Sequence, residues 1–385
     1  MQRIRQIAIL LIGAFLIAAC GQAPASQPTS APAEPTATAS MAQPTSAPAE
    51  PTATASMAQP TTAPAAPLMV MASTSIVADV VRQVGGELVQ VETIVPIGAD
   101  GHSYEPSPQD LARVSTAQII FTVGAGYEEF LDRLIASSGT KAEVVALSES
   151  LTLRTFSEEE AGGHMHGDEH GDEHSDEHGD KHSDEHGDEH SDEHGDKHSD
   201  EHGDEHGAGS VDPHTWTDPN NVKAWVEVIY ATLSRLDPTN ADTYAARAAA
   251  YQSQLDELDR WIAEQFAAIP AERRLIVSDH IVFGYMADRY GLRQLGSIIP
   301  GVSTSASPSA KELAALQDMI ADHGVPAIFV GDIANQQLAE QIARDMGVRI
   351  FTVLTESLTD ADGPGATYID YMRFNVQTIV DGLRG

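Results

Sequence analysis

The sequence of 385 residues has one cysteine, few basic residues and no apolar run long enough to span a bilayer. Because Cys20 is alone, the chain can form no internal disulfide. Its 22 lysines and arginines face 57 acidic residues. The resulting net charge of −35 argues against nucleic acid and anionic lipid as partners and favours cations. Only four of the sixteen histidines lie outside residues 163–207.

The N-terminus has the order of features that is typical of a bacterial export signal. Two arginines precede the apolar run 7–19, which is too short to cross a bilayer comfortably. The sequence IAAC at 17–20 resembles the lipobox of bacterial lipoproteins. That resemblance implies that residues 1–20 are a signal peptide and that a lipid on Cys20 anchors the chain to a membrane. The protein would then work outside the cytoplasm, in the cell envelope. A cleaved signal with a chance cysteine is the alternative.

Residues 21–67 consist largely of proline, alanine, threonine and serine, and they contain the sequence PTSAPAEPTATASMAQ twice, at 28–43 and 44–59. A segment without large apolar side chains cannot form a core. Its proline-rich composition favours an extended, semi-rigid chain. We therefore expect a disordered stalk between the membrane anchor and the body of the protein.

Residues 163–207 form a low-complexity tract in which a histidine recurs every four residues, mostly separated by aspartate, glutamate and either glycine or serine. Imidazole suits zinc, copper, nickel and Fe(II), and neighbouring carboxylates attract divalent cations. The glycines and the near absence of apolar residues predict a disordered loop over 157–209. A solvated acidic spacer is the alternative. The expected weak accessory metal sites are His166, His170, His174, His178, His182, His186, His190, His194, His198, His202 and His206.

The remaining body of about 270 residues alternates strand-like and helix-like stretches, which predicts an α/β fold with parallel sheets. We expect two (β/α) Rossmann-like lobes, each with a roughly four-stranded parallel sheet, at 68–236 and 271–385. Between them, an apolar face at helical spacing predicts one long rigid helix within 237–270 that joins the lobes. An ordinary core helix is the alternative. The residues of this face are Tyr244, Tyr251, Leu255, Leu258, Ile262, Phe266 and Ile269.

Three of the four histidines outside the tract lie where α/β proteins place their ligands, at strand ends or beside helix starts. His102 lies in a turn-rich segment after a predicted strand, His214 precedes a predicted helix, and His280 directly follows a strand. His323 occupies the last turn of a predicted helix, where a cation is favourable, and we assign it no ligand role.

Four segments around these residues resemble the metal-ligand segments of the cluster A-I solute-binding proteins, the zinc and manganese receptors of bacterial ABC importers. The segments are GADGHSYEPSPQDLARV, DPHTWTDPNN, VSDHIVFGYMADRYGL, and TVLTESL followed by TYIDYMRFN. The resemblance covers nearly all of 68–385. It implies two lobes joined by a long helix, with metal held between them by His102, His214, His280 and Glu356. In this family a histidine-rich loop, when present, lies between the first two segments, as the tract does here.

The sequence departs from the family pattern at two positions. Members usually have proline where this chain has Gly101, and aspartate where it has Glu356, while some zinc receptors have water in that last position. Either Glu356 or water is therefore the fourth ligand. Glu105, Trp216 and Asp279 are candidates for neighbouring groups, because ligating histidines usually donate their second N–H to such a group.

Three imidazoles and at most one carboxylate favour Zn(II) over manganese or iron. The resemblance then implies a receptor, not an enzyme, that acts as a monomer and delivers zinc to the permease and ATPase of an ABC importer. Manganese receptors of the family usually have a carboxylate where this chain has His280. A secreted zinc-dependent hydrolase is an alternative, although the sequence lacks the HExxH motif. A manganese receptor and a surface metal buffer or adhesin are the others.

Overall fold

The protein is described by a computed structural model, and all described residues belong to the unit Thr62–Gly385. The predicted signal peptide with Cys20, nearly all of the stalk, and the histidine-rich tract with its accessory sites lie outside the described residues. No helix in the described ranges combines the length and the apolar character needed to cross a membrane. The described ranges are 66–157, 160, 209–299, 304, 306–333 and 336–385.

The N-terminal lobe is built on a parallel sheet with the strand order β2-β1-β3-β4. Its central strand β3 has the sequence IIFT and is buried at every position. Such a continuous apolar run is typical of a parallel strand that is covered on both faces. The edge strand β4 exposes its first two residues. The strands are β1 (Leu68–Ala72), β2 (Val89–Thr93), β3 (Ile119–Thr122) and β4 (Glu143–Ala146).

The C-terminal lobe repeats this topology with the parallel order β6-β5-β7-β8. In each sheet the strand order reverses beside the first strand, and α/β proteins bind ligands at the carboxyl ends of the strands near such a point. The predicted fold of two lobes with four-stranded parallel sheets is confirmed. The strands are β5 (Leu275–Ser278), β6 (Arg293–Ser297), β7 (Ala327–Gly331) and β8 (Arg349–Val353).

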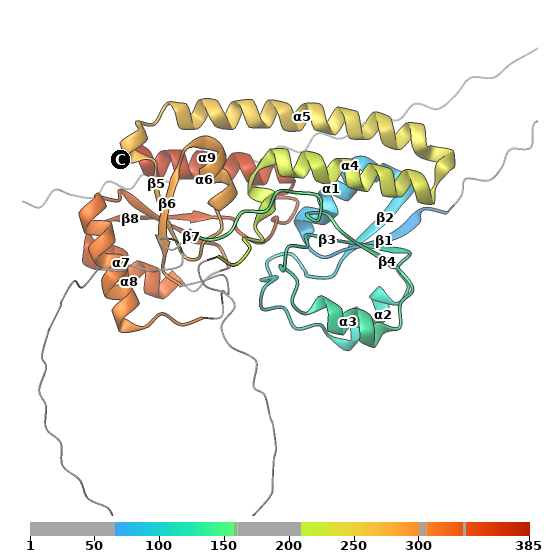
Figure 1. Ribbon diagram of the computed structural model, residues 1–385, viewed down its shortest axis with the longest axis horizontal. Helices are drawn as coiled ribbons and strands as arrows, with labels where there is room; N and C mark the ends of the chain where they lie inside the picture. The colour runs from blue at the N-terminus through green and yellow to red at the C-terminus, as the bar shows by residue number, and fades with distance from the viewer. Residues whose placement is uncertain (1–65, 158–159, 161–208, 300–303, 305, 334–335) are drawn as a thin grey trace, which may run out of the picture. The chain divides into compact units, whose positions relative to one another are not determined.

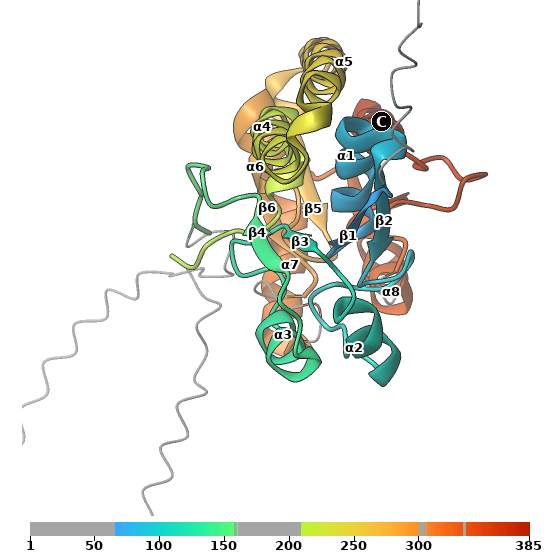
Figure 2. The ribbon, with the colours of Figure 1, turned by 90° about the vertical axis from the view of Figure 1, so that its right-hand side faces the viewer.

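Helices cover both faces of each sheet (Figures 1 and 2). One group packs together on one side of both sheets and consists of α1 (Ser75–Gly85), α4 (Pro219–Leu236), α5 (Ala241–Ala267), α6 (Gly284–Tyr290) and α9 (Tyr368–Arg384). The opposite faces carry α2 (Pro108–Val114), α3 (Leu131–Ser138), α7 (Ala310–His323) and α8 (Gln336–Met346). Short 3-10 turns lie at Gly86–Leu88, Thr215–Thr217, Pro238–Asn240 and Ala271–Arg273.

The long helix α5 runs along both lobes (Figure 1) and contacts α1 and α4 of the N-terminal lobe and α6 and α9 of the C-terminal lobe. Its 27 residues make it about 40 Å long. It begins at Ala241 because Pro238 starts a separate 3-10 turn. The predicted apolar face is buried as expected, and it consists of Tyr244, Tyr251, Leu255, Leu258, Ile262 and Phe266, followed by Ile269 beyond the helix.

A single hydrophobic core extends beneath α5 through both lobes. It includes Ile76 of α1, Leu258 of α5, Ile276 of β5 and Val376 of α9, all fully buried. Two smaller clusters lie under α2 and α3 and under α7 and α8, one on the far side of each sheet. The lobes are therefore joined on the α5 side by continuous packing as well as by the chain, and the carboxyl ends of both sheets can meet below it.

Candidate metal centre

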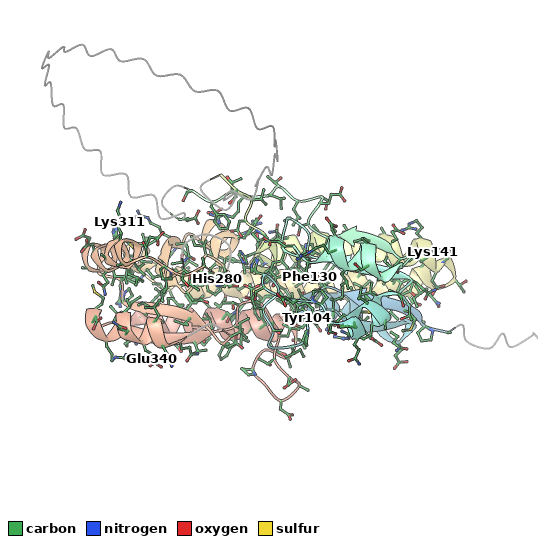
Figure 3. The ribbon with its side chains drawn as sticks, turned by 90° about the horizontal axis from the view of Figure 1, so that it is seen from below. Tyr104, Phe130, Lys141, His280, Lys311 and Glu340 are labelled. Atoms are coloured by element: carbon green, nitrogen blue, oxygen red, sulfur yellow. The ribbon has the colours of Figure 1, made fainter. Side chains whose placement is uncertain are left out.

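The structure brings together the four residues that the family resemblance implied as ligands. His102 follows β2, His214 lies just before the turn that leads into α4, His280 follows β5, and Glu356 follows β8. One ligand atom from each lies within 4.8 Å of the other three. Figure 3 shows His280 in the interior of the molecule, between Lys311 at the end of the C-terminal lobe and Tyr104 and Phe130 of the N-terminal lobe. The group therefore lies where the two lobes meet.

The spacing of the donor atoms fits one small ion. His102 Nε2 lies 3.1 Å from His214 Nε2, and His280 Nε2 lies 2.9 Å from Glu356 Oε1. The remaining carboxylate contacts are 3.7 Å from Oε1 to His214 and 4.0 Å from Oε2 to His102. A tetrahedral zinc ion holds its ligand atoms roughly 3.3 Å apart. Only His102 retains any notable exposure, at 6% of its side chain.

Asp212 fixes the ring of His214. The Nδ1–H of His214 donates to Asp212 Oδ1 at 2.8 Å, and its backbone N–H donates to the same oxygen at 3.0 Å. Burial raises the pKa of Asp212, but the hydrogen bonds from His214 and the charge of Arg154 outweigh it and lower the pKa. The ionised carboxylate therefore holds the proton on Nδ1 and leaves the Nε2 lone pair facing the site. The sequence did not single out Asp212, although aspartate side chains commonly accept a hydrogen bond from the backbone N–H two residues later in a turn.

His280 is held by the candidate Asp279, whose Oδ2 lies 3.1 Å from His280 Nδ1. Burial lowers the pKa of His280, but Asp279 and Glu356 outweigh it, so that the pKa is raised well above its usual value. Burial instead dominates at His102 and lowers its pKa to about 4. Burial alone would raise the pKa of Glu356. The hydrogen bond from His280 and the charges of the three imidazoles outweigh burial, so that the pKa is lowered below its usual value. Glu356 is therefore a carboxylate, the form that binds metal.

Tyr127 is a fifth member of the site that the sequence analysis missed. Its hydroxyl donates to Glu356 Oε2 at 2.5 Å, and its ring packs edge-on to His102 with centroids 4.6 Å apart. A Cβ atom on Gly101 would lie 2.3 Å from the Tyr127 hydroxyl. A side chain at position 101 would therefore require the Tyr127 ring to move. No local pattern marks Tyr127, because its partner Glu356 is 229 residues away.

The other two candidate neighbours do not bond to the ligands. Trp216 packs edge-on against the His214 ring with centroids 5.3 Å apart, but its indole N–H donates to the carbonyl of Thr355 and to the hydroxyl of Tyr371. Glu105 is exposed and lines a separate surface pocket. His323 ends α7 before the left-handed Gly324, as expected, and is no part of the site.

A cavity of about 310 Å³ adjoins the site on the side of the C-terminal lobe. His280 and Glu356 line it, together with Asp100 and Asp279. The three carboxylates in its lining, Asp100, Asp279 and Glu356, attract cations toward this side of the site.

A family model described as zinc-uptake complex component A, periplasmic, or ZnuA, matches residues 70–382. The manganese-binding lipoprotein MntA of Halalkalibacterium halodurans is 31% identical over 317 residues, which is 82% of this chain and 88% of the relative. The manganese ABC transporter substrate-binding lipoprotein PsaA of Streptococcus pneumoniae is 26% identical over 323 residues, with 82% and 89% covered.

Solved structures show the same fold. The periplasmic zinc binding protein TroA of Treponema pallidum has a TM-score of 0.66 at 23% identity, covering 82% of this chain and 99% of that one. A manganese-bound periplasmic metal binding protein from Candidatus Liberibacter asiaticus has a TM-score of 0.63 at 22% identity, with the same coverage. The family consists of substrate-binding components of ABC transporters, which are not enzymes, so the hydrolase alternative falls. The chain belongs to the ZnuA family and is a metal-ion receptor of an ABC importer.

Proposed function

We propose that this protein is a zinc receptor, which binds one Zn(II) ion between its lobes and delivers it to the permease and ATPase of a zinc importer. The ligands are His102, His214, His280 and Glu356. The observation that carries the proposal is the buried set of three imidazole nitrogens and one carboxylate, at the spacing of a tetrahedral ion.

The donor set favours zinc over manganese. Manganese prefers oxygen ligands in an octahedral shell, whereas three nitrogens and one oxygen in a tetrahedral arrangement suit zinc. The relatives MntA and PsaA are named for manganese, and TroA for zinc, so the chain's own ligands must decide. The decisive ligand is His280, whose nitrogen takes a place that an oxygen ligand would fill in a manganese site.

Glu356 is the fourth ligand in this proposal, rather than water. Its Oε1 lies within 3.7 Å of two imidazole nitrogens, and Tyr127 holds Oε2 by a hydrogen bond. A carboxylate that is fixed through one oxygen presents the other to the ion as a single ligand. The longer glutamate side chain therefore reaches the position that the family usually fills with aspartate.

The remaining parts of the chain have accessory roles in this proposal. A lipid on Cys20 anchors the receptor, the stalk over 21–67 gives the body reach, and the protein acts as a monomer. The histidine-rich tract holds several weakly bound ions and raises the local zinc concentration near the cleft.

Deletion of residues 164–206 separates the specific site from the tract. In titrations of the deletion protein we expect one tight Zn(II) site, lost in His280→Ala and retained in the control His323→Ala. If the deletion protein has no tight site, the receptor proposal is wrong, and the protein is a surface metal buffer.

Uptake by cells decides between the two metals. When the host gene carries His280→Ala, we expect uptake of radioactive zinc to fall while manganese uptake is unchanged. A fall in manganese uptake alone would identify a manganese receptor instead.

A further inference from the structure

Arg154 joins three parts of the molecule through its guanidinium group. It donates to Asp212 Oδ2 at 2.6 Å, to Glu160 Oε1 at 2.7 Å and to Asp288 Oδ2 at 3.1 Å. Glu160 precedes the histidine-rich tract, Asp212 follows it, and Asp288 belongs to α6 of the C-terminal lobe. The Asp212 and Glu160 side chains are buried, whereas that of Asp288 is 66% exposed. The first two contacts are therefore the strong ones.

The segments on either side of the tract pair with each other beside this arginine. The backbone N–H of Phe156 donates to the carbonyl of Ser210, and that of Gly209 donates to the carbonyl of Phe156, both at 2.9 Å. The N–H of Asp212 donates to the carbonyl of Arg154 at 3.0 Å. We call residues 154–156 with 209–212 the neck. This pairing fixes the Arg154 and Asp212 side chains side by side.

The start of α6 contacts the neck. The Tyr285 hydroxyl accepts from the backbone N–H of Arg154 at 3.1 Å and donates to the carbonyl of Asp212 at 2.9 Å. A Cβ atom on Gly284 would lie 1.8 Å from Arg154 Nη1, so this position leaves room for the guanidinium only because it is glycine. The C-terminal lobe is thus shaped to hold Arg154 against Asp212.

Asp212 connects this junction to the metal centre. Its Oδ2 is paired with Arg154, and its Oδ1 accepts from the Nδ1–H of His214. A fully buried carboxylate is costly without a paired charge, and removal of one partner of such a pair leaves the other uncompensated. Arg154 is the arginine that supplies this charge.

We propose that Arg154 is a positioning residue for metal binding, which orients His214 through Asp212 and couples that orientation to the contact between the neck and α6. The inference rests on His214 being a ligand, as proposed above. Tyr285 and Asp288 of α6 contact Arg154, and Gly284 leaves room for its guanidinium, so α6 helps to hold Arg154 against Asp212.

The test compares Arg154→Met with wild type in the full mature chain. Loss of a group that orients a metal ligand typically weakens metal binding by about 10–100-fold. We expect a loss of that size in the Zn(II) affinity of Arg154→Met, measured by competition with a chromophoric chelator. We also expect faster release of Zn(II) from the variant. We also expect a changed visible spectrum of the protein with less than one equivalent of Co(II), because this spectrum reports ligand geometry. Arg154→Lys should retain part of the zinc affinity, since lysine supplies the positive charge but not the planar guanidinium with its several N–H donors.

Arg344→Met is the matched control, because Arg344 is exposed and pairs with Glu340 on the same helix. It should leave both the affinity and the spectrum unchanged. A folded Arg154→Met protein with wild-type zinc affinity and cobalt spectrum would overturn the inference. If Arg154→Met does not fold, Arg154→Lys is tested in its place. A wild-type zinc affinity and cobalt spectrum in Arg154→Lys would then overturn the inference. His214→Ala separates the two proposals, since undiminished binding in that variant refutes the site itself.

Discussion

At the scale of single residues, the metal centre differs from the histidine-rich tract in how its donors are held. Asp212 orients His214, Asp279 orients His280, and Tyr127 holds Glu356. Each of these buried contacts fixes one donor, so little conformational freedom is lost when the ion binds. In our proposal the site therefore gains metal affinity from preorganised ligands, as well as from their number.

Zinc binding near neutral pH is expected to release a proton from His280. The raised pKa of His280 means that the ring is protonated in the metal-free site, whereas a ligand must be neutral. His102, with a pKa of about 4, has no proton to lose there. Affinity should therefore rise with pH up to the pKa of His280, by about tenfold per unit for each proton released. Calorimetry of the tract-deleted protein in buffers of different ionisation enthalpy measures this release.

Asp279→Asn is a useful companion in that experiment, since it removes the leading cause of the raised pKa. It should reduce the proton release at neutral pH. An affinity that stays constant between roughly pH 6 and pH 8 would contradict imidazole ligation by His280.

At the scale of elements, the start of α4 sets the position of His214. Asp218 is the N-cap of α4, where its Oδ1 accepts from the N–H of Asn220 at 2.8 Å, and Pro219 occupies the first turn. The other carboxylate oxygen of Asp218, Oδ2, accepts a hydrogen bond from Arg289 of α6 at 2.9 Å. A 3-10 turn of three residues separates His214 from this cap. The ligand is thus placed by a helix terminus that also contacts the other lobe.

Asp218→Ala is expected to weaken both folding and metal binding. Loss of an N-cap lowers the free energy of unfolding by about 0.5–2 kcal/mol. Zinc affinity should fall as well, because the turn that carries His214 loses its anchor. Urea unfolding and zinc titration measure the two effects.

Ser309→Ala is the control for that variant, because Ser309 caps α7 by a capping box in a helix that carries none of the four proposed ligands. It should destabilise the protein by a similar amount and leave zinc affinity unchanged. Equal zinc affinities in the two variants would show that the α4 cap has no part in the site.

At the scale of the whole molecule, the proposed metal centre takes two of its four ligands from each lobe. His102 and His214 come from the N-terminal lobe, and His280 and Glu356 from the C-terminal lobe. On the other side, the lobes share the core beneath α5. In our proposal, an ion therefore links the two lobes at the edge opposite to α5, and its binding free energy adds to the stability of the folded state.

Saturating zinc should raise the melting temperature of the tract-deleted protein by several degrees. At a free concentration of about 1,000 times Kd, binding to the folded state alone contributes about 4 kcal/mol. Differential scanning calorimetry measures the shift, which His280→Ala should abolish and His323→Ala should retain. A shift of the same size in His280→Ala would mean that the stabilising ion binds elsewhere.

The sequence by itself determined the α/β fold with parallel sheets and the long helix within 237–270, because the signals for both are local. The uninterrupted apolar runs of β3 and β7 mark buried parallel strands. The predicted end of a helix at His323 is likewise local, since the next residue, Gly324, takes the left-handed conformation that ends α7. The three histidines outside the tract stood out for a similar reason, since each lies at the end of a strand or the start of a helix.

Only the tertiary structure decided how those residues are held. The hydrogen bond from Tyr127 to Glu356 joins residues 229 positions apart, and Arg154 meets Asp288 across 134 positions. The need for glycine at Gly101 depends on where the Tyr127 ring packs. Periodicity and capping act over a few residues, whereas these contacts exist only because two sheets direct their carboxyl ends toward one another. The sequence thus determined which side chains bind the metal in our proposal, and the packing of the lobes determined their geometry.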